Sequence, residues 1–294
     1  MHPHKFTKPN KMKTIKTGWI GLGTMGTPMC SQLIKAQYSV TVYNRSKDKE
    51  QAVIAMGAAV ASTPAQVMEE SNIIFIMVSD DDAINEIFGG DNGLLAAKVT
   101  GRIIINMSSV SPGISKKYAE LCKQAGNRYL DAPVSGSLKQ AQEAQLVIMV
   151  GGEADIFTIA KPLLECLGKL VMHIGDTGAG NTAKLAINTL LGIQAQGLAE
   201  AVAFAQHNGI SSSNLLTLIN NSALASPFVK IKGDAIIANN FTPAFALKHI
   251  VKDLGLAANE GMTSPLGSMA YNTYKEASEQ LADEDIIAIY KQFI

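Results

Sequence analysis

The stretch Gly21-Leu22-Gly23-Thr24-Met25-Gly26 decides the fold class. It has the spacing G-x-G-x-x-G, follows an apolar segment predicted as a strand at 17–21, and opens a helical pattern at 25–35. A second strand is predicted at 39–43, which completes a βαβ unit of about 30 residues. In this context Gly21 allows a tight turn, Gly23 lets the backbone approach a pyrophosphate, and Gly26 allows close packing of helix on strand. We therefore predict a dinucleotide-binding loop rather than a plain turn between a strand and a helix.

Strand and helix patterns alternate outward from this loop as far as residue 174. Further strands are predicted at 58–61, 72–78, 102–106, 129–131, 146–150 and 170–174, with helices at 47–56, from 64, at 111–125 and at 154–167. After residue 178 only helical patterns follow, at 180–208, 212–221, 245–261, 265–281 and 285–293. Strands that alternate with helices predict a doubly wound sheet. We therefore expect an α/β fold, with a Rossmann-type domain at 17–177 and an all-helical substrate and oligomerisation domain at 178–294.

The composition favours a small-molecule partner. The 294 residues are enough for two domains, and 47% of them are hydrophobic, so a sizeable core can be buried. The 25 basic residues are balanced by 25 acidic ones, which leaves no net basic charge to attract nucleic acid or an anionic membrane. No apolar run reaches the ~18–20 residues needed to span a bilayer. We therefore expect no nucleic-acid partner and no membrane association.

The cysteines and the first residues of the chain point to a cytoplasmic protein. Cys30, Cys122 and Cys166 fit no metal-binding spacing, and we interpret them as core residues in a reducing compartment, with no bound metal. The first 17 residues carry five lysines, no acid and no apolar segment, which argues against a secretory signal. We interpret 1–16 as a disordered tail, within which Met12 could be the true start.

The residues after the second strand indicate which cofactor binds. NAD sites usually place Asp or Glu there, about 20 residues beyond the glycine loop, to accept from the ribose hydroxyl groups. Here the sequence is Tyr43-Asn44-Arg45-Ser46, in which Arg45 can pair with a 2′-phosphate and Ser46 can donate to it. We therefore predict NADP, with NAD as the alternative. In that alternative Arg45 is a solvated loop charge and Asp48 serves the ribose.

A glycine-rich turn at 175–180 leads into an apolar helix that carries Lys184 and Asn188. These residues are four apart, so they share one face of the helix. A lysine among Ala, Leu and Ile side chains is costly unless it has a partner or a chemical role. Desolvation would lower its pKa towards the range of a general acid–base, and Asn188 could hold a substrate oxygen one turn away. The alternative is a lysine whose ammonium group reaches solvent at the start of a helix.

Two further stretches carry candidate binding residues. In Asp131-Ala-Pro-Val-Ser135-Gly136-Ser137, successive backbone N–H groups and two hydroxyl groups could hold a carboxylate, and a simple polar turn explains the stretch equally well. Lys248 and Lys252 are also four apart on a predicted helix. One of them could face a cleft between the domains, or both could lie on a solvated face.

Together these stretches resemble the β-hydroxyacid dehydrogenase family, which includes 3-hydroxyisobutyrate dehydrogenase, tartronate semialdehyde reductase and plant-type glyoxylate/succinic semialdehyde reductases. The resemblance covers residues 17–294 and rests on the family patterns GLGxMGxxM at 21–29, DAPVSG at 131–136, GxGxxxKxxxN ending at Asn188, and KDL at 252–254. The turn Ser108-Ser109-Val-Ser111-Pro112 matches a fifth pattern. The residues at 44–46, the loop PVSGS and the segment 243–249 are most similar to the glyoxylate/succinic semialdehyde reductase branch.

The resemblance implies a reaction and a set of roles. Lys184 would be the general acid in aldehyde reduction and the base in oxidation, while Asn188 would help to hold the substrate oxygen. The substrate carboxylate would bind the backbone of Ser135, Gly136 and Ser137. Cofactor contacts on the nicotinamide side would come from Ser109 and Lys252, and we add Val78 and Ser79 to the cofactor-binding residues. A homodimer or homotetramer formed through the helical domain is also implied.

Two departures from the family pattern leave the identity of the substrate open. The branch usually has SKKPAEDG where this chain has Ser137-Leu-Lys-Gln140-Ala-Gln-Glu-Ala144, so Gln140 replaces a proline and Ala144 replaces a glycine. A Cβ at 144 would shift the loop if the backbone there needs a positive φ. We expect NADP-dependent reduction of glyoxylate or succinic semialdehyde. The alternatives are an NAD-dependent dehydrogenase of the 3-hydroxyisobutyrate or tartronate semialdehyde type, and a catalytically silent NADP-binding module.

Overall fold

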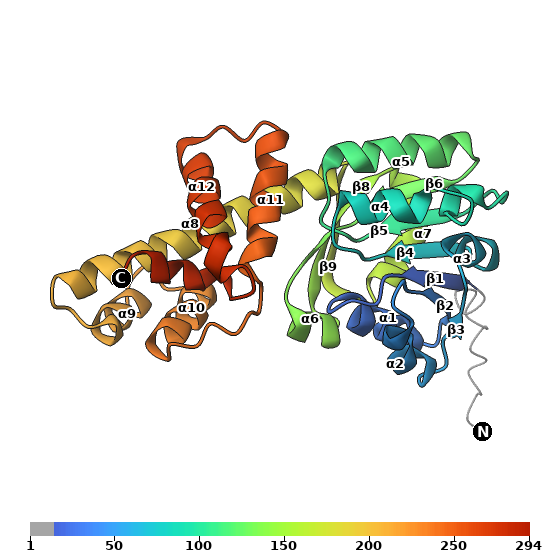
Figure 1. Cartoon of the computed structure of the whole chain (residues 1–294). Coiled ribbons are helices and arrows are strands. Elements are labelled where there is room, and N and C mark those ends of the chain that lie inside the picture. The colour runs from blue at the N-terminus through green and yellow to red at the C-terminus, as the bar shows by residue number, and fades with distance from the viewer. Residues whose placement is uncertain (1–14) are drawn as a thin grey trace, which may run out of the picture. The chain divides into compact units, whose positions relative to one another are not determined.

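The computed structural model describes residues 15–294 and divides into two compact units, one ending at Lys184 and the other beginning at Leu185 (Figure 1). The tail predicted at 1–16 lies outside the described residues except for its end. The division between the units falls inside one long helix, α8 (Ala179–His207), shortly after the domain boundary predicted at 177.

The first unit is built on one nine-stranded sheet. Its strands lie in the order β3-β2-β1-β4-β5-β6-β8-β7, and β9 pairs with β8. The ladders from β3 to β6 are parallel, whereas β8 is antiparallel to β6. The chain runs outward from β1 to β3 on one side and then returns to β4 on the other, so the strand order reverses beside β1. Doubly wound sheets bind ligands at such a reversal. The strands are β1 (Lys16–Ile20), β2 (Ser39–Tyr43), β3 (Ala59–Val60), β4 (Ile73–Ile76), β5 (Ile103–Asn106), β6 (Arg128–Asp131), β7 (Val134–Ser135), β8 (Leu146–Gly152) and β9 (Gly168–Gly175).

Two hydrophobic cores fill the two faces of this sheet. In one core Trp19 and Phe75 stack with their ring centroids 5.4 Å apart and pack with α1, α2 and α7. In the other core Ile20 and Ile74 pack with α3, α4 and α5. Neighbours along a strand, such as Trp19 and Ile20, thus enter different cores, as strands covered on both faces require. The helices are α1 (Gly26–Lys35), α2 (Gln51–Ile54), α3 (Pro64–Glu70), α4 (Asp81–Phe88), α5 (Pro112–Gln124), α6 (Leu138–Gln142) and α7 (Ala154–Leu164), with short 3₁₀ turns η2 (Lys47–Glu50) and η3 (Leu94–Ala96).

The second unit is helical throughout. It contains the rest of α8, then α9 (Ser212–Asn220), α10 (Pro227–Ile237), α11 (Leu247–Asn259), α12 (Pro265–Leu281) and a 3₁₀ helix η4 (Ile286–Gln292) around one core. A buried ion pair joins Lys232 Nζ to Asp285 Oδ1 at 2.6 Å. Asp285 also accepts hydrogen bonds from the backbone N–H groups of Ala244, Phe245 and Ile287. Both parts of the fold class expected from the sequence, the Rossmann-type sheet and the all-helical C-terminal domain, are confirmed.

Several elements differ from those predicted. Helices α4, α6 and α10 and strand β7 were not predicted, and the helix predicted at 47–56 is divided between η2 and α2. The helix predicted at 285–293 is the 3₁₀ helix η4, in which five successive residues from Ile286 to Tyr290 are buried. Because every side of this segment meets the core, its sequence has no single apolar face from which an α-helical period could be distinguished.

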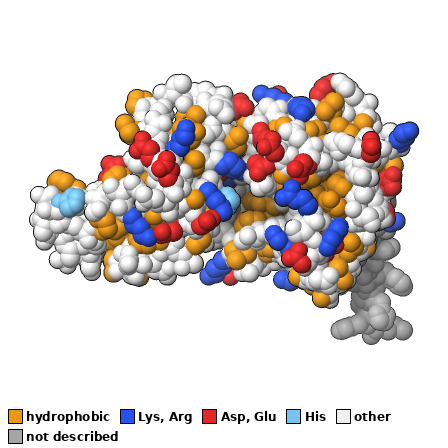
Figure 2. Space-filling view, in the orientation of Figure 1, with side chains coloured by type: hydrophobic (Ala, Val, Ile, Leu, Met, Phe, Trp, Pro, Cys, Tyr) orange, Lys and Arg blue, Asp and Glu red, His pale blue; other side chains and the backbone are white. Residues whose placement is uncertain are grey.

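No helix within residues 15–294 combines the length and the apolar character needed to cross a membrane. On the face seen in Figure 2, basic and acidic side chains are interspersed rather than gathered by sign. Cys30 and Cys122 are buried, and Cys166 is partly buried. Burial raises the pKa of both buried thiols to about 12, which keeps them protonated and unreactive at neutral pH. The interpretation of Cys30 and Cys122 as core residues is thus confirmed.

Candidate cofactor and catalytic site

The glycine loop leads from β1 into α1 at the reversal of strand order. Gly21 has a φ of +95°, and a Cβ added to it would lie 2.2 Å from the carbonyl oxygen of Met77. A Cβ on Gly26 would lie 2.0 Å from the carbonyl oxygen of Gly21. Both glycines are therefore required by the packing of the chain itself. Trp19 Nε1 donates to the Gly21 carbonyl at 2.9 Å, which places the indole ring directly behind the loop.

Gly23 differs from the other two glycines, because an added Cβ would meet nothing within 4 Å. No contact within residues 15–294 explains its lack of a side chain, and the open space in front of it suits a ligand that approaches the backbone closely. Gly23 and Thr24 are exposed, and α1 begins at this point without a side-chain cap. Backbone N–H groups at a helix start attract phosphate. The loop therefore fits the pyrophosphate of a dinucleotide.

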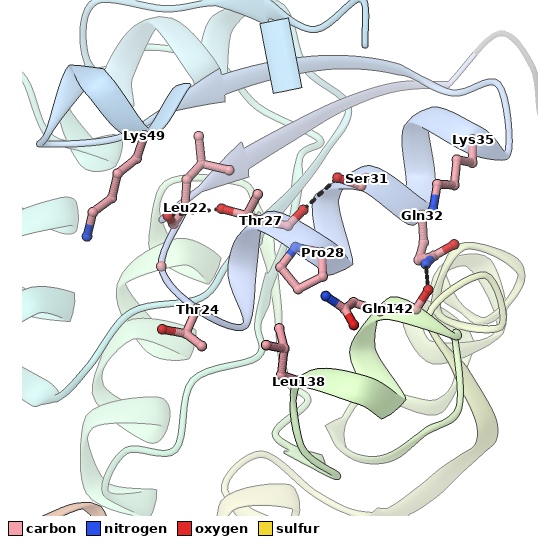
Figure 3. Close-up of a pocket in the computed structure, with 11 residues that line it drawn as sticks. Leu22, Thr24, Thr27, Pro28, Ser31, Gln32, Lys35, Lys49, Leu138 and Gln142 are labelled. Carbon is pink, nitrogen blue, oxygen red and sulfur yellow. Dashed lines mark hydrogen bonds between the residues drawn. The ribbon is translucent and has the colours of Figure 1, made fainter. Parts of the chain in front are cut away.

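A cavity of about 570 Å³ lies against this loop (Figure 3). The glycine loop supplies Leu22, Gly23 and Thr24 to its wall, and the rest comes from α1, from Leu138 and Gln142 of α6, and from Lys49. In Figure 3 Lys49 lies at the glycine-loop end of α1, and Lys35 lies at the far end of the helix. The cavity offers room and positive charge beside the loop. Arg45, Ser46, Val78 and Ser109 do not line it, so it covers only one part of the predicted cofactor site.

The end of β2 is fixed to the glycine loop by Asn44. Its side-chain oxygen accepts from the backbone N–H of Leu22 at 2.8 Å, and its side-chain nitrogen donates to the Ser46 carbonyl at 2.7 Å. The Asn44 backbone N–H donates to Glu50, a buried carboxylate that also pairs with Lys47. The carboxylate of Glu50 is therefore engaged within the protein. Nothing in the sequence pattern indicated that Asn44 would hold the loop rather than face a ribose.

Most of the exposed charges at the end of β2 are cationic. Arg45 is 83% exposed and pairs with Glu86 of α4 at 3.0 Å, which is a surface ion pair of little strength. Lys49 lies four residues beyond Arg45, in η2, and reaches the cavity. Lys49 was not among the predicted site residues, although a second cation this close to Arg45 was a usable signal. Asp48, the carboxylate of the NAD alternative, is exposed in η2.

The ends of β4 and β5 are tied together on the same edge of the sheet. Ser108 Oγ accepts from the backbone N–H of Val78 at 2.9 Å, and the Ser108 N–H donates to Asn106 Oδ1. Ser109 is half-buried beside this link, and Ser79 is exposed. The structure thus brings the predicted cofactor residues of both strand ends to the edge where the glycine loop also lies.

The start of α8 is bound to the end of β6. Asp131 is fully buried, and its carboxylate accepts from the backbone N–H groups of Gly178 at 2.7 Å and Asn181 at 2.9 Å. Burial raises the pKa of Asp131, and these backbone hydrogen bonds oppose the shift. Asp131 therefore serves as an internal acceptor for the first turn of α8. The DAPVSG stretch joins this anchor to the predicted carboxylate loop.

Lys184 lies on the second turn of α8 and is buried, with 8% of its surface exposed. That burial disfavours the alternative of a lysine whose ammonium group reaches solvent. Asn188 follows one turn later and is also buried. Lys184 is the last residue of the first unit, and Asn188 belongs to the second. Both lie on α8, which continues from one unit into the other.

Asn188 is held by an acidic residue of α11. Its Nδ2 donates to Asp253 Oδ2 at 2.5 Å, which fixes the direction of the carboxamide. The other oxygen of Asp253 lies 3.2 Å from Lys252 Nζ, close enough for an ion pair but without a hydrogen bond. Lys248, by contrast, is half-exposed and pairs with Asp283. Of the two lysines predicted on this helix, Lys252 is therefore the one associated with Asn188.

The predicted carboxylate loop is partly occupied by its own chain. Gly136 has a φ of +137°, and Ser137 caps α6. Gln140 Oε1 accepts from the backbone N–H of Ser137 at 2.9 Å and from its hydroxyl group at 2.6 Å. A carboxylate that binds Ser137 must therefore displace the Gln140 side chain. The sequence showed that Gln140 replaces a proline, but it did not reveal this contact.

Known proteins match this arrangement over nearly the whole chain. Residues 16–175 match the family described as the NAD binding domain of 6-phosphogluconate dehydrogenase. Residues 178–293 match the family described as NAD-binding of NADP-dependent 3-hydroxyisobutyrate dehydrogenase. The chain belongs to the β-hydroxyacid dehydrogenase family. It is therefore an NAD(P)-dependent oxidoreductase.

Individual members of the family agree with this assignment. Glyoxylate/succinic semialdehyde reductase 2 of Arabidopsis thaliana is 32% identical over 285 residues, which cover 95% of this chain and 80% of the plant protein. The 2-hydroxy-3-oxopropionate reductase of Escherichia coli is 38% identical over 245 residues, or 83% of each protein. The structure of Mycobacterium tuberculosis 3-hydroxyisobutyrate dehydrogenase with L-serine superposes with a TM-score of 0.87 at 29% identity, covering 95% of this chain and 98% of the other.

Proposed function

We propose that this dehydrogenase uses NADPH to reduce a short aldehyde acid, glyoxylate or succinic semialdehyde, to the hydroxy acid. The observation that carries the cofactor preference is the end of β2. There Asn44 is bound to the glycine loop, Glu50 is buried, and Arg45 and Lys49 are exposed. These cations attract a 2′-phosphate. Asp48 also lies in η2, but it does not line the cavity that Lys49 reaches.

Reduction of an aldehyde adds a hydride to its carbon and a proton to its oxygen. The bound nicotinamide cofactor supplies the hydride. Lys184 donates the proton as negative charge develops on the oxygen, and it accepts the proton in the oxidative direction. Asn188, on the same face of α8, orients that oxygen, and Asp253 holds the Asn188 carboxamide in a fixed direction.

The substrate class rests on the loop Ser135–Ser137 and on the relatives. Backbone N–H groups of the loop suit a carboxylate, which would displace the Gln140 side chain from the Ser137 N–H. The plant relative is named for glyoxylate and succinic semialdehyde, and the bacterial relative for 2-hydroxy-3-oxopropionate. All three compounds are aldehydes that carry a carboxylate. The first two are proposed because residues 44–46 and 243–249 are most similar to that branch.

The proposal is tested by following NADPH and NADH oxidation with glyoxylate, succinic semialdehyde, tartronate semialdehyde and methylmalonate semialdehyde. We expect the highest kcat/KM with NADPH and one of the first two compounds. We also expect Arg45→Ala to raise the KM for NADPH and to leave the KM for NADH unchanged. A preference for NADH, or for methylmalonate semialdehyde, would assign the chain to the alternative 3-hydroxyisobutyrate type.

The role of Lys184 is tested with Lys184→Met, which keeps most of the length of the side chain and removes the ammonium group. We expect kcat to fall by a factor of about 10²–10⁴, the usual contribution of a general acid. NADPH should still quench the fluorescence of Trp19, the one tryptophan of the sequence, which lies behind the glycine loop. Turnover within about tenfold of wild type would show that another group donates the proton.

A further inference from the structure

Asn181 is the most fully engaged side chain at the start of α8. It has no exposed surface, and its backbone N–H donates to Asp131. Its side-chain oxygen accepts from the backbone N–H of Val110 at 3.1 Å, and its Nδ2 donates to Ser115 Oγ at 3.2 Å. One residue of the turn before Lys184 thus joins three segments that are far apart in the sequence.

These contacts continue to the predicted cofactor residues. Ser115 also interacts with Tyr129, whose hydroxyl accepts from Asn106 Nδ2 at 2.9 Å. The Asn106 side-chain oxygen accepts from the Ser108 backbone N–H, and the Ser108 hydroxyl accepts from the Val78 backbone N–H. A buried group of polar side chains therefore extends from the first turn of α8 to the ends of β5 and β4. All of its members lie in the first unit, as does Lys184.

Close packing fixes the same helix start from the other side. A Cβ on Gly180 would lie 2.5 Å from the Met149 carbonyl oxygen and 2.7 Å from the Asp131 carbonyl oxygen. A Cβ on Gly151 would lie 2.5 Å from Asp131 Oδ1. At Gly180 and Gly151 the backbone of α8 therefore packs closely on β6 and β8. This packing alone does not fix how α8 is rotated about its axis, or shifted along it, relative to the segment 108–110. Asn181 hydrogen-bonds to Val110 of that segment and can fix both.

We infer that Asn181 is a positioning residue that sets Lys184 against the nicotinamide-side segment 108–110, an inference that rests on the proposed roles of Lys184 and Ser109. Asn181 does not touch substrate or take part in proton transfer. It acts by fixing the turn that precedes Lys184. Displacement of a catalytic group by about 1 Å can reduce turnover about a hundredfold. Loss of the Asn181 side chain is therefore expected to lower kcat more than it lowers binding.

Asn127 provides a matched control in the same unit. It is also buried, its Oδ1 accepts from the Arg102 backbone N–H at 2.9 Å, and its Nδ2 donates to the carbonyl groups of Val99 and Ala125. These contacts join loops that precede β5 and β6, at the opposite end of those strands from Asn181. Asn127→Ala thus removes comparable hydrogen bonds away from the proposed site.

The experiment compares Asn181→Ala with Asn127→Ala, using whichever aldehyde acid of the panel is turned over. Both variants should lose thermal stability to a similar degree. Only Asn181→Ala should lower kcat, by about 10–100-fold, with the KM values for NADPH and aldehyde little changed. Ser115→Ala removes only the partner of Nδ2 and should lower kcat less, which provides a second test if Asn181→Ala does not fold.

Hydrogen–deuterium exchange gives a readout that does not need turnover. Asn181→Ala should speed exchange of the Val110 amide and of the peptide 178–184, whereas Asn127→Ala should speed exchange at Arg102 instead. Wild-type kcat in both Asn181→Ala and Ser115→Ala, or an equal loss of kcat in Asn127→Ala, would overturn the inference. If Lys184→Met retains turnover, the proposed function fails instead, so the two failures are distinguishable.

Discussion

Ala144 has a φ of +55°, in the left-handed region that side chains with a Cβ rarely adopt. It lies two residues beyond α6, where related chains usually have glycine. The sequence indicated the problem but not its outcome, because a Cβ can either shift the loop or be accepted with strain. Here the backbone keeps the left-handed conformation, so the strain is carried in the native state.

Ala144→Gly should therefore stabilise the first unit. Relief of the left-handed strain outweighs the extra freedom of glycine in the unfolded chain, so we expect the free energy of unfolding to rise by about 0.5–1 kcal/mol. Thermal or denaturant unfolding measures the change. Ala52→Gly, at an exposed helical position in α2, should have the opposite sign. A loss of stability in Ala144→Gly would mean that the position is not strained.

Other site residues show what a sequence can and cannot reveal at this scale. The glycine loop and the pair Lys184 and Asn188 were predictable because their spacing reflects local geometry. The contacts of Asn44 with Leu22, and of Asn181 with Val110, join residues 22 and 71 positions apart, and no local pattern encodes them. Such long-range hydrogen bonds depend on which strand ends meet at one edge of the sheet.

At the scale of elements, local chemistry predicted those with a clear period or cap. The helix at Pro64, capped by Thr63, begins where expected. Ser226 followed by Pro227 gives the same signal, since the Ser226 hydroxyl accepts from the Val229 N–H, yet α10 was not predicted. The two-residue strand β7 is a different case. It is formed by pairing with β8, which lies elsewhere in the sequence. The strand propensity of its two residues alone could not have predicted it.

The buried pair Lys232–Asp285 holds α10, the segment 244–245 and η4 together, so its loss should destabilise the second unit. Asp285→Ala leaves a buried lysine without its partner and three backbone N–H groups without an acceptor. We expect it to lower the free energy of unfolding by about 3–5 kcal/mol, as measured by denaturant titration. Asp283→Ala removes the exposed partner of Lys248 and serves as the control, with no resolvable change expected. Equal effects of the two substitutions would contradict this account.

At the scale of the whole molecule, the second unit leaves many large apolar side chains exposed. Where such side chains form a contiguous patch, the patch often marks a contact site. The family resemblance implies a homodimer or homotetramer through the helical domain, and we propose that a second copy of the chain covers this surface. The side chains concerned are Phe204, Leu218, Leu224, Ile231, Leu266 and Met269, each more than 60% exposed.

Light scattering coupled to size exclusion tests this proposal directly. We expect the wild-type mass to be two or four times that of one chain, and we expect Phe204→Glu with Leu218→Glu to lower it. Ile159→Glu changes a 51%-exposed residue of α7 in the first unit and should leave the mass unchanged. A wild-type mass equal to one chain would remove the proposed oligomer and leave the surface without an explanation.

The continuity of α8 through the division between the units has a practical consequence for dissecting the protein. Cutting the gene at the structural division, between Lys184 and Leu185, would sever the helix and leave the proposed proton donor and Asn188 on different fragments. A cut near residue 177 would keep the pair on one fragment but remove Gly178 and Asn181 from the Asp131 carboxylate. We therefore expect neither fragment to be catalytically active by itself. Chimeras between relatives should exchange both units together.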